Sequence, residues 1–459
     1  MKITIFGTGY VGLVTGASLA NLGHTVLGVD VDQEKINALQ QGTISFYEPG
    51  LKELVARNRE QGRLSFSSHL AEGINFGEVL FTCVGTPSTG NGAADLEAVY
   101  TVAKEVAKEG ARVTQSRFQG QSQTKAENYK ILVNKSTVPP GTARKCQQLL
   151  QEMNPSGQIE VVSNPEFLKQ GNAVYDFNHP DKIVIGAETE KAVAVMRKVY
   201  QGLLKTYIPF LEMNWETAEM VKYANNTFLA TKISFINEIA NICQLVEADV
   251  KQVAQAMGLD YRIGPKFLNA GIGYGGSCFS KDLRALISAA EEHGYSAKLL
   301  QEVDAFNERQ KNFFLPKIIQ KLKRVNGNTV TVWGASFKPK TSDLREAPAV
   351  SLIQELLSQG LQVRLYDPIA LEEARRVFNN IIPHKTIPNN AIHYSSSIAD
   401  SVQGSNLIVL VTEWDEFRSV NFTELGTMMN SKILFDGRNI YDPLLIQAEG
   451  FEYYGVGRG

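Results

Sequence analysis

The chain begins with MKITIFGTGYVGLVTGASLANLGHTVLGVD (residues 1–30), which carries the clearest signal of its fold. Within it, GTGYVG (7–12) follows an apolar run rich in β-branched residues and precedes a helical pattern. At this spacing Gly7 permits a tight turn, Gly9 lets the backbone approach a pyrophosphate, and Gly12 lets the helix pack on the strand. The stretch therefore predicts a strand, a phosphate-binding turn and a helix in succession.

A carboxylate follows the second predicted strand, since Asp30 comes directly after Thr25–Val29. Dinucleotide-binding folds carry an acidic residue about 20 residues beyond the glycine pattern, where it accepts hydrogen bonds from ribose hydroxyls. The same carboxylate repels a 2′-phosphate, and the N-terminus of the helix attracts the pyrophosphate. This pattern predicts a dinucleotide site that favours NAD over NADP.

The length and composition are those of a globular protein. The 459 residues suggest about three domains. Hydrophobic residues make up 43% and charged residues 20% of the chain, which are ordinary shares for such proteins. Because the formal net charge is −2, the chain has no bulk attraction for nucleic acid or an anionic membrane, and we expect neither as a partner.

The sequence also bears on location. No run reaches the roughly 18 apolar residues that a membrane-spanning helix needs. Lys2 and the apolar run ending near Ala20 imitate a secretory signal, but the regularly spaced glycines favour the nucleotide-binding turn. Four cysteines do not make a disulfide framework for a chain of this size, which fits a reducing compartment. We expect a cytoplasmic protein.

Short β-branched runs alternate with helical patterns over the first 200 residues, which predicts a doubly wound parallel sheet. Helical spacing then takes over, with helices expected over Asn214–Ala248, Asp282–His293 and Ala297–Arg324, the last interrupted at Pro316. From Thr329 the α/β alternation returns. The predicted strands are Lys2–Phe6, Thr25–Val29, Glu78–Val84, Lys130–Asn134, Glu160–Ser163, Lys182–Ile185, Thr329–Trp333, Gln362–Tyr366, Leu407–Val411 and Lys432–Phe435.

We therefore expect an α/β protein with a Rossmann-type N-terminal domain (1–205), a central helical domain with a long connecting helix (206–325), and a Rossmann-like C-terminal α/β domain (326–459). One segment departs from this pattern. Gly110–Tyr129 is rich in Gln and Ser and carries almost no large apolar residues, which predicts a surface insertion before the strand at Lys130.

The stretch GIGYGGSCFSKD (271–282) places a cysteine after four closely spaced glycines. Ser280 is the expected N-cap of the following helix, so Cys278 would lie just before a helix N-terminus with Lys281 nearby. Both features lower the pKa of a thiol and make it a nucleophile. The glycines, which let the backbone approach a ligand, are Gly271, Gly273, Gly275 and Gly276, whereas the other cysteines, Cys83, Cys146 and Cys243, are expected to be inert.

This cysteine loop closely resembles the catalytic-cysteine loop of the UDP-glucose 6-dehydrogenases. Further matches follow in family order across nearly the whole chain, and together they are highly specific. They are GTGYVG (7–12), VGTPS (84–88), KSTVPPGT (135–142), NPEFL (164–168), AEMVKYANNTFLATKISFINE (218–238), YRIGPKFLNAG (261–271) and FKPKTSDLRE (337–346).

The resemblance implies an NAD-dependent oxidation of UDP-glucose at C6 to UDP-glucuronate, which consumes two NAD and one water. The central domain would carry the catalytic lysine and cysteine, and the C-terminal domain would help to bind the UDP-sugar. A cysteine suits this chemistry because a thiolate captures the intermediate aldehyde as a thiohemiacetal, and further oxidation gives a thioester that water cleaves. The resemblance further implies a homodimer or a higher homo-oligomer.

The motif matches assign catalytic roles. Cys278 matches the nucleophile, and Lys222 and Asn226, one helical turn apart, match the pair that stabilises negative charge at C6. Lys222 also matches a participant in the first deprotonation. Asp282 matches the carboxylate that holds water or accepts a proton, and Glu166 matches the glutamate assigned to thioester hydrolysis.

Binding residues follow in the same way, with Thr137 matching a threonine that orients water and approaches the cofactor. Expected NAD contacts are Gly7, Gly9, Tyr10, Val11, Gly12, Asp30, Lys35, Thr86, Thr137, Gln170, Lys281 and Arg345. Expected substrate contacts are Glu166, Phe167, Leu168, Lys169, Lys222, Asn226, Phe267, Asn269, Gly271, Gly275 and Lys338, together with Arg262, which matches an arginine that reaches a neighbouring subunit's site.

Two positions depart from the commonest family pattern. Gln170 stands where many members have a glutamate that contacts the cofactor, and Ser280 stands where many have a proline at the start of a helix. Neither change removes a reacting group.

Several alternatives share part of the pattern. A GDP-mannose or UDP-N-acetylhexosamine 6-dehydrogenase would use the same mechanism, although FLNAGIGYGGSCF (267–279) favours UDP-glucose. A β-hydroxyacid dehydrogenase needs no cysteine and would lack the C-terminal α/β unit. A binding protein that retains only the fold should have lost a reacting group, and none is lost. The six histidines form no ligand-spaced pair, so no metal is expected.

Overall fold

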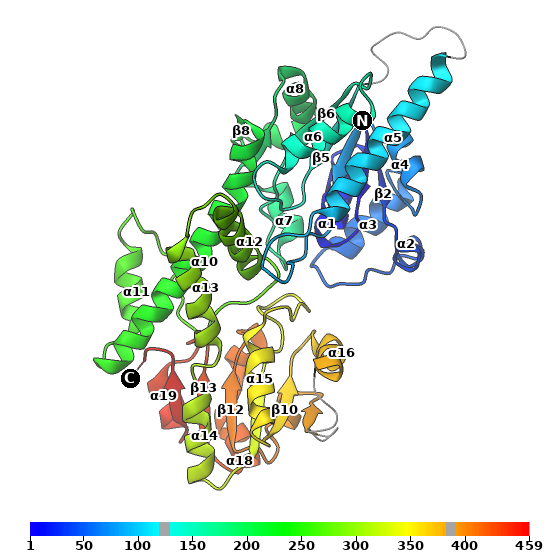
Figure 1. The fold of residues 1–459 in the computed structure, drawn as a ribbon. Coiled ribbons are helices and arrows are strands. Elements are labelled where there is room, and N and C mark those ends of the chain that lie inside the picture. Colours follow the sequence, from blue (N-terminus) through cyan, green and yellow to red (C-terminus); the bar gives the residue numbers. More distant parts are fainter. Residues whose placement is uncertain (119–128, 382–390, 459) are drawn as a thin grey trace. The chain divides into compact units, whose positions relative to one another are not determined.

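The computed structural model describes residues 1–118, 129–381 and 391–458. The chain divides into two compact units, Met1–Asn225 with Ser288–Gly294 and Asn226–Ile287 with Tyr295–Gly459. Figure 1 shows one Rossmann-type sheet in each unit, with helices packed around it. This confirms the expected α/β class with Rossmann-like domains at both ends and a helical middle.

The first unit is built on a sheet with strand order β3-β2-β1-β4-β5-β6-β7-β8. Its neighbouring strands run parallel except β6 and β7, which meet antiparallel at Ser163 and Gly186, so the expected all-parallel sheet is wrong at this one pair. The strands β3 and β8 were not expected from the sequence. The bounds are β1 Lys2–Phe6, β2 Thr25–Val29, β3 Leu64–Ser67, β4 Val79–Thr82, β5 Lys130–Asn134, β6 Ile159–Ser163, β7 Ile183–Gly186 and β8 Phe210–Met213.

Alternation along the strands buries both faces of this sheet. In β4, Val79 and Phe81 join one hydrophobic cluster with α1 and α3, while Leu80 joins the cluster formed with α5 and α6. Successive side chains of a strand point to opposite faces, so the apolar run of β4 needs helices on both sides. The helices are α1 Tyr10–Asn21, α2 Gln33–Gln40, α3 Leu51–Glu60, α4 Leu70–Phe76, α5 Glu97–Phe118, α6 Thr142–Met153, α7 Ala173–Asn178, α8 Glu190–Val199 and α9 Gln201–Leu204.

The expected insertion at Gly110–Tyr129 is wrong over residues 110–118. Residues 110–118 continue α5, because Glu97–Phe118 forms one helix of 22 residues. Tyr129 directly precedes β5, and residues 119–128 lie outside the described part of the chain.

The helical middle confirms the change of pattern after Asn214. The long helix α10 covers Trp215–Leu245, inside the expected Asn214–Ala248. Pro316 lies in the first turn of α14, where a missing backbone N–H costs nothing, so the interruption falls just before it. The remaining helices of this section are α11 Val250–Gly258, α12 Phe279–Glu292, α13 Lys298–Lys311 and α14 Leu315–Arg324.

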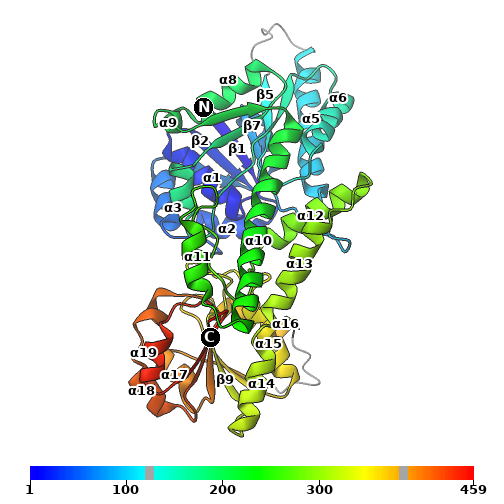
Figure 2. The same cartoon turned by 90° about the vertical axis from the view of Figure 1, so that its left-hand side faces the viewer.

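The second unit contains a parallel sheet with strand order β11-β10-β9-β12-β13-β14. Figure 2 shows it from another side. The sequence missed β11 and β14. Its elements are β9 Thr329–Trp333, α15 Pro348–Ser358, β10 Gln362–Tyr366, α16 Leu371–Ile381, β11 Ile392–Tyr394, α17 Ile398–Val402, β12 Leu407–Leu410, the 3₁₀ helix η2 Asp415–Ser419, α18 Phe422–Met428, β13 Ile433–Asp436, α19 Pro443–Ala448 and β14 Glu452–Gly455.

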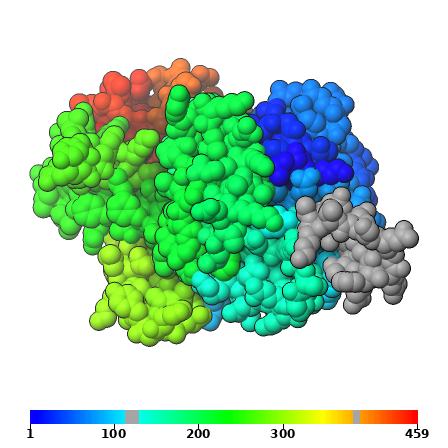
Figure 3. Space-filling view, turned by 90° about the horizontal axis from the view of Figure 1, so that it is seen from above, coloured from blue at the N-terminus to red at the C-terminus, as the bar shows by residue number. Residues whose placement is uncertain are grey.

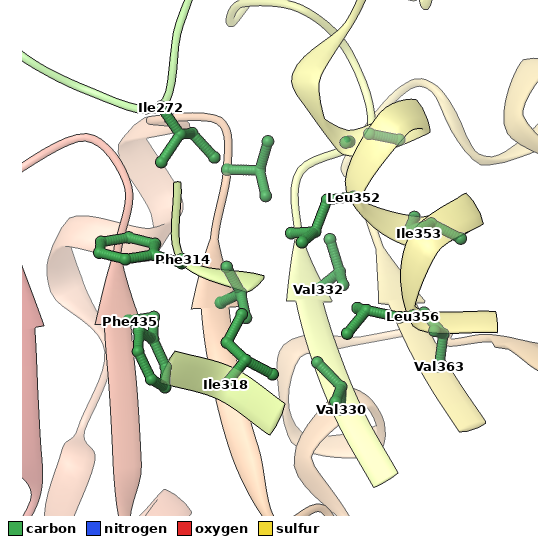
Figure 4. Packing of buried hydrophobic residues seen from close by; sticks show 14 of the residues in the cluster. Ile272, Phe314, Ile318, Val330, Val332, Leu352, Ile353, Leu356, Val363 and Phe435 are labelled. Carbon is green, nitrogen blue, oxygen red and sulfur yellow. The ribbon is translucent and has the colours of Figure 1, made fainter. Parts of the chain in front are cut away.

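The two faces of this sheet are also filled separately. Val330 and Val332 of β9 pack with Ile318 and Phe435 on one face, as Figure 4 shows. Trp333 belongs to the cluster on the other face and stacks on Phe417 with ring centroids 5.1 Å apart.

Figure 3 shows the helical middle in green at the surface of the molecule. On α10, Phe228, Phe235 and Ile242 recur every seven residues and are 64%, 45% and 50% exposed. Residues seven apart lie on one helix face. Every described helix is too short or too polar to pass through the core of a bilayer.

Truncation of the buried Phe435 tests the packing of the second unit. Phe435→Ala leaves a cavity beside Phe314 and should lower the free energy of unfolding by about 3–5 kcal/mol. The measurement is urea denaturation followed by tryptophan fluorescence, since Trp333 and Trp414 both lie in this unit's core. Tyr295→Ala, at a position 69% exposed, is the control and should change stability by less than about 0.5 kcal/mol. Equal effects would contradict this account of the core.

Candidate functional site

The glycine turn after β1 has the shape that the sequence predicts. Gly7 has φ +90°, and a Cβ at Gly12 would lie 1.8 Å from the carbonyl oxygen of Gly7. Gly9 is the N-cap of α1, makes no side-chain cap, and has no described atom within 4 Å of where its Cβ would be. The first amides of α1 thus have no side chain bonded across them, and a pyrophosphate fits against this turn. Val11, in the first turn of α1, is partly buried.

Asp30 lies at the end of β2 beside the same turn. Its Oδ2 accepts hydrogen bonds from the backbone N of Thr8 at 2.8 Å and from Thr8 Oγ1 at 3.0 Å, and it pairs with Lys35 Nζ at 3.0 Å. Burial raises the pKa of Asp30, but the hydrogen bonds from Thr8, Lys35 and Asp32 outweigh it, and the pKa falls below its ordinary value. Asp30 is therefore an anion near neutral pH, which suits hydrogen bonding to a ribose.

Tyr10, from the same glycine turn, reaches a buried carboxylate. Its hydroxyl donates to Glu48, which also accepts hydrogen bonds from the backbone N of Gly171 and of Ala173. Gln170 is the residue immediately before Gly171. The structure thus connects two segments expected to bind NAD through a residue, Glu48, that the sequence analysis missed. No periodic pattern marks Glu48, which lies in a loop, and only its place before Pro49 and Gly50 indicates a fixed turn.

The loops after β4 and β5 meet at their predicted residues. Thr86 Oγ1 donates to the carbonyl oxygen of Thr137 at 2.9 Å. Thr86 is 7% exposed, and Thr137 is partly buried. Thr86 and Thr137 lie just beyond the carboxyl ends of β4 and β5, which are neighbouring parallel strands. Ligands of open α/β sheets bind at this edge.

The structure brings Glu166 and Lys222 together as a buried ion pair. Lys222 Nζ lies 2.9 Å from Glu166 Oε1, and the two side chains are only 5% and 7% exposed. Glu166 Oε2 accepts a hydrogen bond from the backbone N of Leu168 at 2.6 Å, and Lys222 lies 5.5 Å from the ring centroid of Phe167. An amine and a carboxylate held this closely out of water can pass a proton between them. Lys169 is instead 60% exposed and pairs with Asp176.

Two buried ionisable residues near this pair lie in motifs quoted above, but the sequence did not predict a role for either of them. Lys135 donates to Asn164 Oδ1 at 3.2 Å, and burial lowers its pKa to about 8. Glu219 accepts hydrogen bonds from the backbone N of Gly141 and of Ala143 at 2.7 and 2.8 Å, and burial raises its pKa to about 8. Both fix the KSTVPPGT loop, Lys135 by its contact with Asn164 and Glu219 by its contacts from α10.

A second group of predicted residues lies in the other unit. Asn226 Nδ2 donates to Asp282 Oδ2 at 2.6 Å, and Lys281 Nζ lies 2.8 Å from Asp282 Oδ1. Asp282 is 1% exposed and Asn226 5%. Although Lys222 and Asn226 are one turn apart on α10, each therefore meets a carboxylate of its own.

Cys278 is the exposed cysteine of the four, and it directly precedes α12 as expected. The expected cap at Ser280 is wrong. Because α12 begins at Phe279, Ser280 lies inside the first turn and is 1% exposed, and the carbonyl of Cys278 accepts the first helical bond from Asp282 N at 2.8 Å. The other three cysteines are buried, and burial raises the pKa of Cys83 to about 12 and that of Cys146 to about 11. Those two thiols stay protonated at neutral pH.

Glycines of the cysteine loop allow a close approach of other segments of the protein. A Cβ at Gly275 would lie 2.3 Å from the carbonyl oxygen of Glu346, and one at Gly276 would lie 2.7 Å from the ring of Phe337. Gly271 similarly faces the backbone of Gly437. These contacts explain Gly275 and Gly276 by packing against the 337–346 segment of the same unit, and the expected approach of a ligand stays a prediction.

That segment places two more predicted residues near the loop. The carbonyl of Arg345 accepts a hydrogen bond from Gly276 N at 2.8 Å. Hydrogen bonds to Asp343 raise the pKa of Arg345, and the charge of a Cys278 thiolate adds to the effect. Lys338 lies 5.4 Å from the ring centroid of Phe337.

The 261–271 stretch is more exposed. Arg262 is 74% exposed and pairs with Asp260, and Asn269 is also exposed. Phe267 has φ +64° and its ring contacts Phe279 edge-on at 6.4 Å. In the described residues, no group of three or more His, Cys, Asp or Glu side chains could hold a metal ion.

Comparison with known families accounts for most of the chain. Residues 1–204 match the NAD binding domain of the UDP-glucose/GDP-mannose dehydrogenase family, residues 216–309 its central domain, and residues 331–443 its UDP binding domain. A UDP-glucose 6-dehydrogenase of Rhizobium meliloti is 41% identical over 462 residues, and the match covers 100% of both chains.

Solved structures agree. A UDP-glucose dehydrogenase of Pyrobaculum islandicum superposes with a TM-score of 0.86 at 33% identity, covering 100% of this chain and 98% of that one. A UDP-D-ManNAc dehydrogenase of Pyrococcus horikoshii gives a TM-score of 0.82 at 27% identity, with 100% of each chain covered. The resemblance seen in the sequence is confirmed, as are NAD as cofactor and oxidoreductase as enzyme class. The chain belongs to the UDP-glucose/GDP-mannose dehydrogenase family.

Proposed function

We propose that this enzyme oxidises UDP-glucose at C6 to UDP-glucuronate, consuming two NAD and one water for each sugar. The observation that carries the proposal is Cys278, an exposed thiol at the start of α12, in a chain whose other three cysteines are buried. A simple alcohol dehydrogenase has no use for such a nucleophile, whereas a four-electron oxidation must hold its aldehyde intermediate.

The cofactor is expected at the glycine turn of the first unit. Gly7, Gly9 and Gly12 shape the turn for the pyrophosphate, and Asp30 meets a ribose. Bound NAD supplies the hydride acceptor for both oxidations. The other residues expected to contact NAD, which include Tyr10 and Arg345, remain predictions.

Different residues of the chain carry out the proton transfers and the acyl chemistry. Lys222 and Asn226 supply a cation and an amide donor that stabilise negative charge on the C6 oxygen. The thiolate of Cys278 adds to the aldehyde carbon and forms a C–S bond. The oxygen of the resulting thiohemiacetal is held in place while it loses its proton. When the thioester has formed, Glu166 assists attack by water, the C–S bond breaks, and the carboxylate leaves with the thiol regenerated.

The remaining residues orient these groups. Asp282, bonded to Asn226 and Lys281, takes up a proton or holds water, and Thr137 orients water next to the cofactor. Phe167, Leu168, Lys169, Phe267, Asn269, Gly271, Gly275 and Lys338 are proposed to surround the sugar nucleotide. Fixed positive charge at Lys169 and Lys338 suits a diphosphate.

The choice of UDP-glucose rests on the relatives that carry that name at about 40% identity over full length. A relative named for UDP-D-ManNAc is more distant in sequence, at 27%. A UDP-N-acetylhexosamine or GDP-mannose substrate is therefore the second candidate, with the same chemistry.

Assembly, location and domain bounds remain predictions. The stripe formed by Phe228, Phe235 and Ile242 on α10 supports a homo-oligomer, because monomers rarely expose contiguous apolar surface. The proposed role of Arg262 at a neighbouring subunit's site depends on that assembly. The cytoplasmic location and the division at 205 and 325 are retained as proposed from the sequence.

Counting NADH against sugar tests the proposed reaction. Purified protein with limiting UDP-glucose and excess NAD should form two NADH per sugar, and Cys278→Ala should abolish the reaction. Cys243→Ala, which removes a buried thiol in another helix, is the matched control and should still give two. One NADH per sugar would contradict the role of Cys278. No NADH with UDP-glucose but two with GDP-mannose or a UDP-N-acetylhexosamine would overturn the substrate and keep the mechanism.

Replacing Glu166 tests its role in hydrolysis. Glu166→Gln keeps the size but removes the carboxylate that pairs with Lys222, and kcat should fall at least about 100-fold. Because the block lies at hydrolysis, intact-mass spectrometry after acid quenching should find a substrate adduct on the enzyme. Glu190→Gln, at an exposed helix start, should behave as wild type. A slow variant with no adduct would place Glu166 earlier in the reaction.

Asp30 sets the choice between cofactors. In Asp30→Asn the repulsion of a 2′-phosphate is lost, and the ratio of kcat/KM for NAD to that for NADP should fall by about tenfold or more. Asp32→Asn, which alters the cap of α2, is the nearby control. An unchanged ratio in Asp30→Asn would show that cofactor choice lies elsewhere.

A further inference from the structure

We propose that Glu48 is a positioning residue that ties the end of the 166–171 segment to the glycine turn, so that cofactor-binding and substrate-binding segments hold one geometry. The role of residues 166–171 in this proposal rests on the proposed function. The remaining part, the effect on cofactor binding, rests on the NAD-binding turn.

Glu48 connects three separate parts of the first unit. Its Oε2 accepts hydrogen bonds from the hydroxyl of Tyr10 and from the backbone N of Gly171 at 2.6 Å. Its Oε1 accepts from the backbone N of Ala173, the first residue of α7, at 2.7 Å. The backbone N of Gly171 also lies 3.2 Å from the Tyr10 hydroxyl. These contacts span more than 120 residues of sequence.

The carboxylate is buried without a cationic partner. Glu48 is 5% exposed, and among the described residues no basic side chain forms an ion pair with it. A buried carboxylate is costly unless donors surround it, so the hydroxyl and the two amides must stay in place to offset its desolvation. A charged group with three neutral donors therefore fixes the backbone at Gly171 more firmly than a neutral side chain would.

The loop that carries Glu48 is itself held. Phe46 packs on the ring of Tyr10 with centroids 5.1 Å apart, and Ile44 packs against the core of the unit. Gly171 has φ +78°, a conformation that needs glycine and that leaves little choice of path for the chain at this point.

The other end of the same segment is fixed separately. Glu166 pairs with Lys222 and accepts a hydrogen bond from Leu168 N. The stretch 166–171 thus has one anchor at Lys222 and one at Glu48. Loss of the Glu48 anchor should let Gln170 and its neighbours shift relative to the turn at Tyr10, while the fold and the Glu166–Lys222 pair remain.

Glu48→Gln is the decisive variant, because it replaces one of the two accepting oxygens, which bond Gly171 N and Ala173 N, with an NH2 group that cannot accept. NADH binding, followed by fluorescence titration, should weaken about tenfold, the loss expected for one hydrogen bond to a charged group. Steady-state kinetics with UDP-glucose should show a higher KM for NAD and a lower kcat. Tyr10→Phe, which removes one donor and leaves both amides bonded, should show a smaller change in the same direction. Glu53→Gln, on the exposed side of α3, is the control and should bind NADH as wild type does.

Thermal unfolding separates positioning from stability. If Glu48→Gln lowers the unfolding midpoint but keeps wild-type NADH affinity, kcat and KM, Glu48 is only structural and the proposal fails. If Glu48→Gln does not fold, Tyr10→Phe decides: unchanged NADH affinity and kcat in that variant also overturn the proposal. A wild type that binds NADH but does not oxidise UDP-glucose would refute the proposed function alone. The NADH titration would still test the positioning role of Glu48.

Discussion

The buried ion pair between Glu166 and Lys222 is the interaction on which the first unit's candidate chemistry depends. Its atoms lie 2.9 Å apart with almost no exposure. Removing either partner leaves a charge stranded out of water, which costs about 3–5 kcal/mol. The pair therefore locks α10 to the turn after β6, and it does so at the residues that the proposed reaction requires.

Around that pair, buried ionisable side chains repeatedly hold loops. Lys135 bonds Asn164 next to Glu166, Glu219 holds the loop at Gly141, and Glu48 holds Gly171. Each of these groups is desolvated, so each depends on fixed donors or acceptors from another element. In the second unit, Asp282 lies one turn after Cys278 and is held in a similar way, by a hydrogen bond from Asn226 and an ion pair with Lys281. Loops at the ends of strands thereby keep defined conformations.

The sequence predicted those features that local pattern controls. Strands such as Lys2–Phe6 and Thr329–Trp333 agree to the residue, because apolar runs of β-branched residues between turns are a local signal. The strands β3, β8, β11 and β14 were missed. They are the edge strands of the two sheets and lack the continuous buried apolar run of an inner strand such as β12. Ser280 was misplaced because the helix begins at Phe279, two residues before the Lys281 that a cap at Ser280 implies, and such a boundary depends on packing.

For the candidate site, motifs located Cys278, Lys222 and Glu166, but they did not reveal which groups meet. The pairing of Asn226 with Asp282, the reason for Gly275 and the contacts of Glu48 are all long-range, and no spacing along the chain encodes them.

The most direct test of covalent catalysis is acid quenching of the wild-type enzyme during turnover of UDP-glucose, followed by mass mapping of the peptide containing Cys278. Covalent catalysis predicts a substrate adduct on that cysteine. An unmodified Cys278 together with free UDP-sugar aldehyde in solution would contradict it.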